Sequence, residues 1–240
     1  MPDLARTLRL TRFNVILLSR NRLAFLYATV LPLMPLLLLF TGDRGSRDLG
    51  ESTITTLLLI VGLFPVYYNV LSQFVSRRDE LVLKRMRTGE ARDGELLASI
   101  ALPGAVSALV VCALAVPIAV ALDQRFPAQP LLYALAAVLA VIMFTAFAYW
   151  TAAWTRSAEA AQLTSMPIIF LSFLGSIAPQ LDGVLHDLVA LTPGAALSEL
   201  VRVGWFAEDG SGLVPLLVMA AWTAVAVALA GRSLRWEPRS

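Results

Sequence analysis

The sequence predicts an all-α membrane protein, a single transmembrane domain formed by residues 1–240 with six transmembrane helices. Hydrophobic residues make up 58% of the chain and charged residues only 15%, whereas soluble domains carry roughly 25% charged residues. So few charges cannot cover the surface of a water-soluble fold of this size. Six long stretches contain no Asp, Glu, Lys or Arg, and the basic residues gather in alternate connections between them.

The six uncharged stretches are long enough to cross a bilayer as helices. About 20 helical residues, rising 1.5 Å each, span a hydrocarbon core of about 30 Å. Polar connections containing Gly and Pro separate the stretches. The first stretch is longer than the apolar core of a cleaved signal peptide, so we expect it to be retained. The predicted spans are residues 23–41, 53–75, 97–122, 131–154, 160–181 and 213–231.

The basic residues predict the orientation of these spans. With the N-terminus in the cytoplasm, the inner segments hold fifteen Arg or Lys and the outer segments only four, Arg44, Arg47, Arg125 and Arg202. Acidic residues divide almost equally, eight inside and nine outside. This is the positive-inside pattern of a multi-pass protein. We therefore expect a protein of the cell (inner or plasma) membrane with both termini in the cytoplasm.

Residues 1–22 have the pattern of an amphipathic helix. Leu4, Leu8, Thr11, Val15 and Leu18 share one face of such a helix, and Arg6, Arg9 and Arg20 fall on the opposite face. A helix with this distribution lies in the membrane interface, as a simple anchor before the first span or as a contact for a partner. The basic residues of this predicted interfacial helix are Arg6, Arg9, Arg12 and Arg20.

The connection 76–95, on the cytoplasmic side, has the highest density of charge. Ser76 and Asp79 are typical of a helix start, and Gly89 and Gly94 are typical of helix ends, so we expect a short charged helix between them. Its basic side chains can pair with acidic groups of a partner or with lipid phosphates. The alternative is a basic loop that only sets the orientation of the spans.

The order of these features resembles the permease subunit of ABC-2 type exporters. Permeases of that family have an interfacial N-terminal helix, six spans and a charged helix between spans two and three, with a motif close to Arg-Glu-x-Gly-x-Leu-x-Arg-Leu before Thr-Pro. This chain reads Arg78-Asp79-Glu80-Leu81-Val82-Leu83-Lys84-Arg85-Met86-Arg87-Thr88, without the Gly and Pro. The stretches 166–179 and 191–202 are also similar to that family, so the resemblance covers nearly the whole chain.

The resemblance implies that the charged helix is a coupling helix docked on a separate ABC-type ATPase. Two ATPase copies would bind two permease chains, as a homodimer or as a heterodimer with a sister permease. The ATP and Mg²⁺ would belong to the ATPase, and the cargo would be an amphipathic or apolar drug, antibiotic, peptide or lipid-like molecule exported from the cytoplasm. The implied ATPase contacts are Arg77, Arg78, Asp79, Glu80, Lys84, Arg85 and Arg87.

The residues themselves point to transport without catalysis by this chain. A P-loop requires Gly-x-x-x-x-Gly-Lys-Ser/Thr, and the single lysine, Lys84, follows no Gly-rich run. We therefore expect no enzyme activity, no bound cofactor or metal, and no nucleic acid partner, only membrane lipid and protein partners. The uncharged spans argue against a proton-coupled carrier. The alternative function is an ATP-independent membrane assembly or lipid-handling protein.

Two further segments carry candidate roles. Near the cytoplasmic end of the second span lie four polar residues that we interpret first as contacts for helix packing. If the protein dimerises around a pathway, these residues are its expected lining: Tyr67, Tyr68, Asn69 and Gln73. Residues 182–212 combine helix-forming residues with several glycines and a proline, and we expect a re-entrant or interfacial helical segment at the outer side rather than a plain loop.

Overall fold

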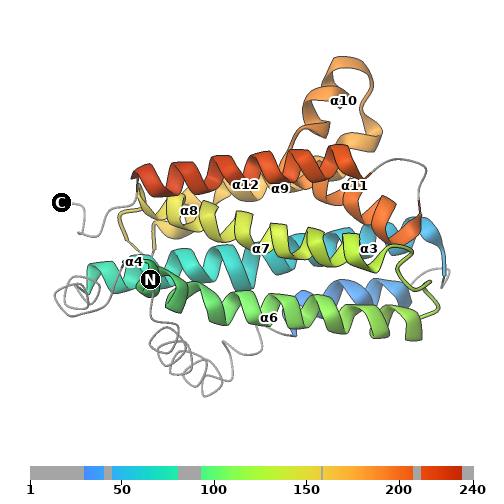
Figure 1. Cartoon of the computed structure of the whole chain (residues 1–240), viewed down its shortest axis with the longest axis horizontal. Coiled ribbons are helices and arrows are strands. Elements are labelled where there is room, and N and C mark those ends of the chain that lie inside the picture. The colour runs from blue at the N-terminus through green and yellow to red at the C-terminus, as the bar shows by residue number, and fades with distance from the viewer. Residues whose placement is uncertain (1–29, 41–44, 81–92, 158, 208–211, 234–240) are drawn as a thin grey trace.

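The computed structural model describes residues 30–40, 45–80, 93–157, 159–207 and 212–233, and all regular structure within them is helical. Four helices are long and apolar enough to cross a membrane. They are Arg47–Asp79, built from α3 (Arg47–Val61), η2 (Gly62–Tyr68) and α4 (Asn69–Asp79); α6 (Asp93–Ala121); α7 (Pro130–Ala152); and α12 (Leu213–Ser233). They run along the long axis of the molecule (Figure 1) and coincide with the second, third, fourth and sixth predicted spans.

The first and fifth predicted spans correspond to shorter helices. Residues 23–29 lie outside the described part of the chain, and η1 (Leu31–Phe40) covers most of the remainder of the first span. The residues of the fifth predicted span form α8 (Ala161–Thr164), α9 (Met166–Leu174) and the tighter helix η3 (Gly175–Gln180). Pro167 lacks the backbone N–H that would hydrogen-bond to the preceding turn, and α9 ends at Leu174. By length and composition, the described helices thus provide four spans, or five if one bent pair is counted.

That bent pair is formed by α10 (Gly183–Ala190) and α11 (Pro193–Phe206), which meet at 85°. The α11 start is sharply defined, because Pro193 occupies its first turn and the Thr192 hydroxyl accepts a hydrogen bond from the Ala195 N–H over 3.3 Å. In Figure 1, α10 stands away from the bundle while α11 lies against it. The expected helical content of residues 182–212 is therefore present in their described part.

The second span widens around Pro65. The seven residues of η2 form a π-helix, in which the Asn69 N–H bonds to the Phe64 carbonyl five residues earlier. The Pro65 carbonyl is instead bonded by the Asn69 side-chain amide over 3.2 Å. Gly104 of α6 packs directly on this carbonyl, since a Cβ at that position would lie 2.1 Å from the Pro65 oxygen. At the Pro65 carbonyl, a hydrogen bond from the Asn69 side chain thus takes the place of the backbone hydrogen bond of a regular α-helix.

The end of the second span differs from the predicted boundary. The sequence predicts a new helix from Ser76, whereas α4 continues through Ser76 to Asp79 without a break. Two contacts of its last turn hold it in this form: Arg77 bonds to Gln73 one turn earlier, and Arg78 bonds to the end of α7. The first charged residues of the connection are therefore part of the spanning helix itself.

Candidate functional site

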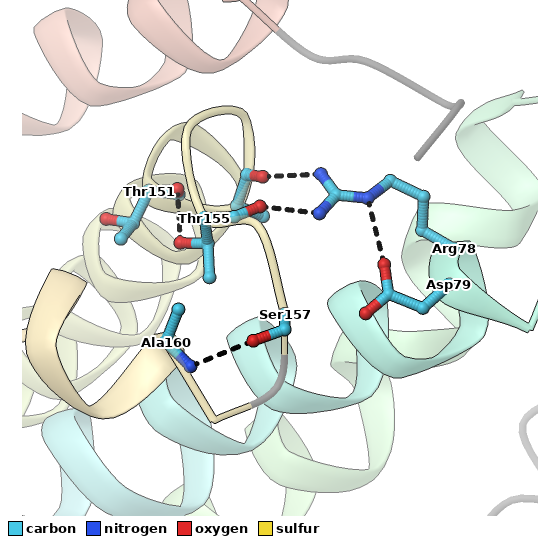
Figure 2. Close-up of polar contacts among 7 residues, drawn as sticks. Arg78, Asp79, Thr151, Thr155, Ser157 and Ala160 are labelled. Atoms are coloured by element: carbon cyan, nitrogen blue, oxygen red, sulfur yellow. Dashed lines mark hydrogen bonds and ion pairs between the residues drawn. The ribbon is translucent and has the colours of Figure 1, made fainter. Parts of the chain in front are cut away.

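The ends of α4 and α7 meet α8 at one end of the bundle (Figure 1). Arg78, in the last turn of α4, contacts the end of α7 there. Its side chain is 0% exposed. One guanidinium nitrogen donates to the Ala152 carbonyl over 2.8 Å and the other donates to the Thr155 carbonyl over 2.5 Å. Figure 2 shows the guanidinium between these carbonyls and the Asp79 carboxylate, whose oxygen lies 3.7 Å from the Arg78 Nε.

The chemistry of a helix end explains this contact. The last carbonyls of a helix have no partner within it and carry a partial negative charge. A guanidinium is always protonated, and its planar array of N–H groups can satisfy two such oxygens at once. Arg78 thus caps α7 from a different helix. A buried cation would be costly without this neutralisation.

Short polar side chains build the turn between α7 and α8 that Arg78 contacts. The Thr155 hydroxyl donates to the Thr151 carbonyl and lies 2.8 Å from the Thr164 hydroxyl, while the Ser157 hydroxyl accepts from the Ala160 N–H over 3.2 Å. Figure 2 shows two of these bonds, from Thr155 to Thr151 and from Ala160 to Ser157. The Thr155–Thr164 contact joins the end of α7 to α8. Hydrogen bonds at this junction therefore join α4 to the end of α7 and the end of α7 to α8.

Some of the predicted ATPase contacts lie at this junction, and the others lie outside the described residues. Asp79 and Glu80 are exposed, and Arg77 is half-buried. Arg78 is buried, which places it beneath the surface rather than on it. Lys84, Arg85 and Arg87 lie outside the described residues, as do Arg6, Arg9, Arg12 and Arg20 of the predicted interfacial helix.

Three of the polar side chains near the end of the second span form a ladder along one face of α4. The Asn69 side-chain amide donates to the Pro65 carbonyl, and its Oδ1 accepts a hydrogen bond from the Gln73 Nε2 over 2.8 Å. The Gln73 Oε1 in turn accepts from Arg77 over 3.1 Å. All three side chains are half-buried, with one helical turn between successive members. This ladder connects the π-helix with the charged end of α4.

Tyr67 and Tyr68, the other predicted lining residues, are placed differently from each other. Tyr67 is 0% exposed, and its hydroxyl lies 3.1 Å from the Thr151 hydroxyl of α7, to which it donates. Tyr68 is half-buried and packs against the hydrophobic core. Within this chain Tyr67 therefore connects α7 to the second span, and the half-buried Asn69 and Gln73 are the better placed to contact a ligand.

A second polar junction, which the sequence did not predict, lies at the opposite end of the bundle. The Arg202 Nε of α11 lies 3.0 Å from a Glu51 carboxylate oxygen of α3, and another Arg202 nitrogen lies 3.1 Å from Glu199. The Trp205 indole N–H donates to the Arg125 carbonyl over 2.9 Å. These contacts hold α11 to the ends of two spans. In the sequence, these contacts are indicated only by the presence of charged residues near the ends of the predicted spans.

Chemically, both junctions are structural connections between helices rather than arrangements of a nucleophile with a base. Among the described residues, no group of three or more His, Cys, Asp or Glu side chains is placed to hold a metal ion. No protein-family model matches the chain, and no curated protein matches it. The functional argument therefore depends on the residues of the chain and their geometry.

Proposed function

We propose that this chain is the membrane subunit of an ATP-driven exporter of the ABC-2 permease type. It moves an amphipathic or apolar cargo, such as a drug, antibiotic, peptide or lipid-like molecule, out of the cytoplasm. Two ATPase subunits, which bind ATP and Mg²⁺, act on a homodimer of this chain or on a heterodimer with a sister permease. The four long apolar helices and the unequal distribution of arginine support the membrane setting of this proposal.

The buried position of Arg78 is the observation that carries the proposal. A transport subunit without its own P-loop needs a rigid part through which a partner can move the spans. Arg78 joins the last turn of the second span to the turn after the fourth span, directly before the charged connection 81–92. A force on that connection is therefore transmitted to two spans, because their ends are held by the same guanidinium.

The complete fold in this proposal has six spans, with both termini in the cytoplasm. The first span continues η1 towards the N-terminus, preceded by the interfacial helix of residues 1–22. The fifth span consists of α8, α9 and η3. The α10–α11 pair is the outer re-entrant or interfacial segment, and its 85° bend and the exposed apolar side chains of α10, among them Val184 and Leu188, support this role.

The ladder of Asn69, Gln73 and Arg77 supports a location for the pathway. These polar groups are half-buried along one face of α4, and they end at the charged side of the bundle. We assign Asn69 and Gln73 to the pathway lining and Tyr67 to helix packing. The exposed Asp79 and Glu80, with Lys84, Arg85 and Arg87, are the contacts for the ATPase.

The test is purification of the tagged full chain from its native membranes, followed by identification of bound proteins and measurement of ATP hydrolysis. We expect a P-loop ATPase in equal copy number. Reversing the charges of Glu80 and Lys84 should release it. Purification of a stable chain without any ATP-hydrolysing partner would contradict the proposal and favour an ATP-independent assembly or lipid-handling protein.

The variant Arg78→Lys distinguishes binding of the ATPase from transmission of its movement to the spans. Lysine keeps the positive charge but cannot hold two carbonyl oxygens in one plane. We expect the ATPase to remain bound while the ATP-driven change in accessibility of the Asn69 face is lost, measured by labelling Asn69→Cys. Arg77→Lys, a change at the adjacent residue, which donates to Gln73 of its own helix, is the matched control. Equal behaviour of the two variants would contradict the role of Arg78.

A further inference from the structure

One face of the second span is left partly uncovered by the described helices, near the Arg78 end of the bundle. Between positions 64 and 77, the residues that are not buried recur every three or four positions, so they form a single stripe along the helix. The stripe begins at Phe64, which is 45% exposed, and ends at Arg77, roughly 20 Å away along the helix axis. Each of its side chains between these two carries a polar group: Tyr68, Asn69, Ser72, Gln73 and Ser76.

The composition of this stripe differs from that of a surface that faces lipid. The exposed positions of α6 beyond its first turn are all apolar, among them Val106, Val110 and Leu114. Hydrocarbon neither donates nor accepts hydrogen bonds, so amides, hydroxyls and a guanidinium in a span are costly unless a polar partner faces them. We therefore expect the stripe to face a polar partner rather than acyl chains.

The hydrogen bonds along the stripe run in one direction. Arg77 can only donate, so the Gln73 oxygen must face it, which turns the Gln73 amide N–H groups towards Asn69. The Asn69 oxygen accepts from Gln73, and its amide donates to the Pro65 carbonyl, which can only accept. The chain of bonds thus leads from a cation to a carbonyl. Each amide keeps one N–H beyond this chain, polarised by the cation at its start.

Charge at the end of the stripe favours the same kind of ligand as these N–H groups. The Arg77 guanidinium stays positive, and its acidic neighbour Glu80 is exposed and lies beyond the stripe, towards the charged connection. If two copies of the chain face each other across a pathway, two Arg77 cations approach and repel one another. An anion between them relieves that repulsion, whereas a cationic cargo adds to it.

We propose that the cargo is an amphipathic acid, an apolar body with a carboxylate, phosphate or sulfonate group. The acidic group pairs with Arg77 and accepts the Gln73 N–H, while the apolar body extends past Tyr68 to Phe64. The order from cation to amide to aromatic ring along the helix matches the order from acid to apolar body in such a molecule. This inference rests on the proposed export function, because it takes the Asn69 and Gln73 face as the pathway lining, and it names the cargo class.

The test compares two photoreactive probes that differ only in charge. They are hexadecanesulfonate and its neutral sulfonamide, each with the same diazirine on the chain, added to the full chain in nanodiscs of phosphatidylcholine. Mass spectrometry of the cross-linked peptides measures labelling of residues 64–77. We expect about tenfold more labelling by the sulfonate, the effect of one hydrogen-bonded charge pair. Equal labelling by the two probes would overturn the proposal.

Substitutions at Arg77 show whether its charge selects the acid. Arg77→Gln can still donate to the Gln73 oxygen but carries no charge, so sulfonate labelling should fall to the level of the sulfonamide. Arg77→Lys keeps the charge and should keep the preference. Arg125→Gln, which removes an exposed arginine from the opposite end of the bundle, is the matched control and should also keep it. A preference that survives Arg77→Gln would overturn the proposal.

Two further measurements separate this inference from its alternatives. Phosphatidylglycerol in place of part of the phosphatidylcholine should leave sulfonate labelling unchanged, and its loss would mean that the stripe holds a membrane lipid instead of cargo. Labelling requires no ATPase, so acid-selective labelling of a chain without an ATPase partner would support the acid site and contradict export. An ATPase complex whose ATP hydrolysis both probes stimulate equally would support export and overturn the acid site.

Discussion

The Arg78 guanidinium donates a hydrogen bond to the Thr155 carbonyl over 2.5 Å, and 77 residues of sequence separate the two. With the parallel bond to Ala152, it closes the end of α7 from the last turn of α4. This contact lies directly before the most charged connection of the chain. The same guanidinium thereby joins the ends of α4 and α7.

Removing the Arg78 side chain should destabilise the junction. Arg78→Met leaves two buried carbonyl oxygens without their donor, which costs about 2 kcal/mol of the free energy of unfolding. The measurement is the unfolding transition of the purified chain in detergent, with Arg77→Met as the control. Because Arg77 is half-buried and bonds within its own helix, its loss should cost less than about 1 kcal/mol. An equal loss of unfolding free energy in the two variants would show that Arg78 does not stabilise the end of α7.

Tyr67→Phe should affect stability but not ligand preference. The change removes a single hydrogen bond to the Thr151 hydroxyl, which costs about 1 kcal/mol or less in a membrane bundle. Because Tyr67 is 0% exposed, cargo selectivity should stay unchanged, whereas Asn69→Leu should alter it. Resistance profiles of cells expressing each variant against a panel of amphipathic compounds measure this. A changed profile for Tyr67→Phe alone would reverse the assignment.

Gly194→Ala should separate α9 from α11. A Cβ at Gly194 would lie 1.7 Å from the Ser172 carbonyl oxygen, so the two helices must move apart. Such overpacking costs about 1–3 kcal/mol. Gly231→Ala, which enters open space, is the control, and thermal unfolding in detergent compares the two. If Gly194→Ala is as stable as Gly231→Ala, the close approach of the broken fifth span to α11 is wrong.

The Glu51–Arg202 contact should contribute little to stability despite its short distance. Both side chains are partly exposed, at 21% and 32%, and ion pairs in such positions are worth less than about 1 kcal/mol. A double-mutant cycle with Glu51→Gln and Arg202→Gln measures the coupling, which should fall further as salt concentration rises. A coupling above about 2 kcal/mol, insensitive to salt, would mean that this end of the bundle is closed to water.

The long apolar helices could be predicted from the sequence because a helix of about 20 residues without charged side chains is typical of a lipid environment. The second, third, fourth and sixth runs each fall on one long apolar helix. The change from the α-helix α9 to the tighter helix η3 at Gly175 was not predicted, since Gly175 packs closely on Gly194 and Ala195 of α11. Composition alone cannot report such a contact between distant segments.

The sequence directed attention to the candidate site but not to the contacts inside it. Charge density directed attention to the connection that begins at Ser76, and Arg78 was included as a surface contact. Its burial depends on two backbone carbonyls, which any residue at positions 152 and 155 would provide, so no sequence signal could reveal it. The i, i+4 spacing of Asn69 and Gln73, by contrast, correctly placed them on one helix face.

The membrane threading of the chain is tested most directly by single-cysteine labelling in intact cells. Cys112 is the single cysteine of the chain, and it is buried. Its replacement by Ala leaves in place the backbone carbonyl that Tyr133 bonds. On that background, Phe126→Cys should react with a membrane-impermeant maleimide, and Glu80→Cys should react only after the cells are permeabilised. Labelling of Glu80→Cys from outside, or protection of Phe126→Cys, would contradict the account.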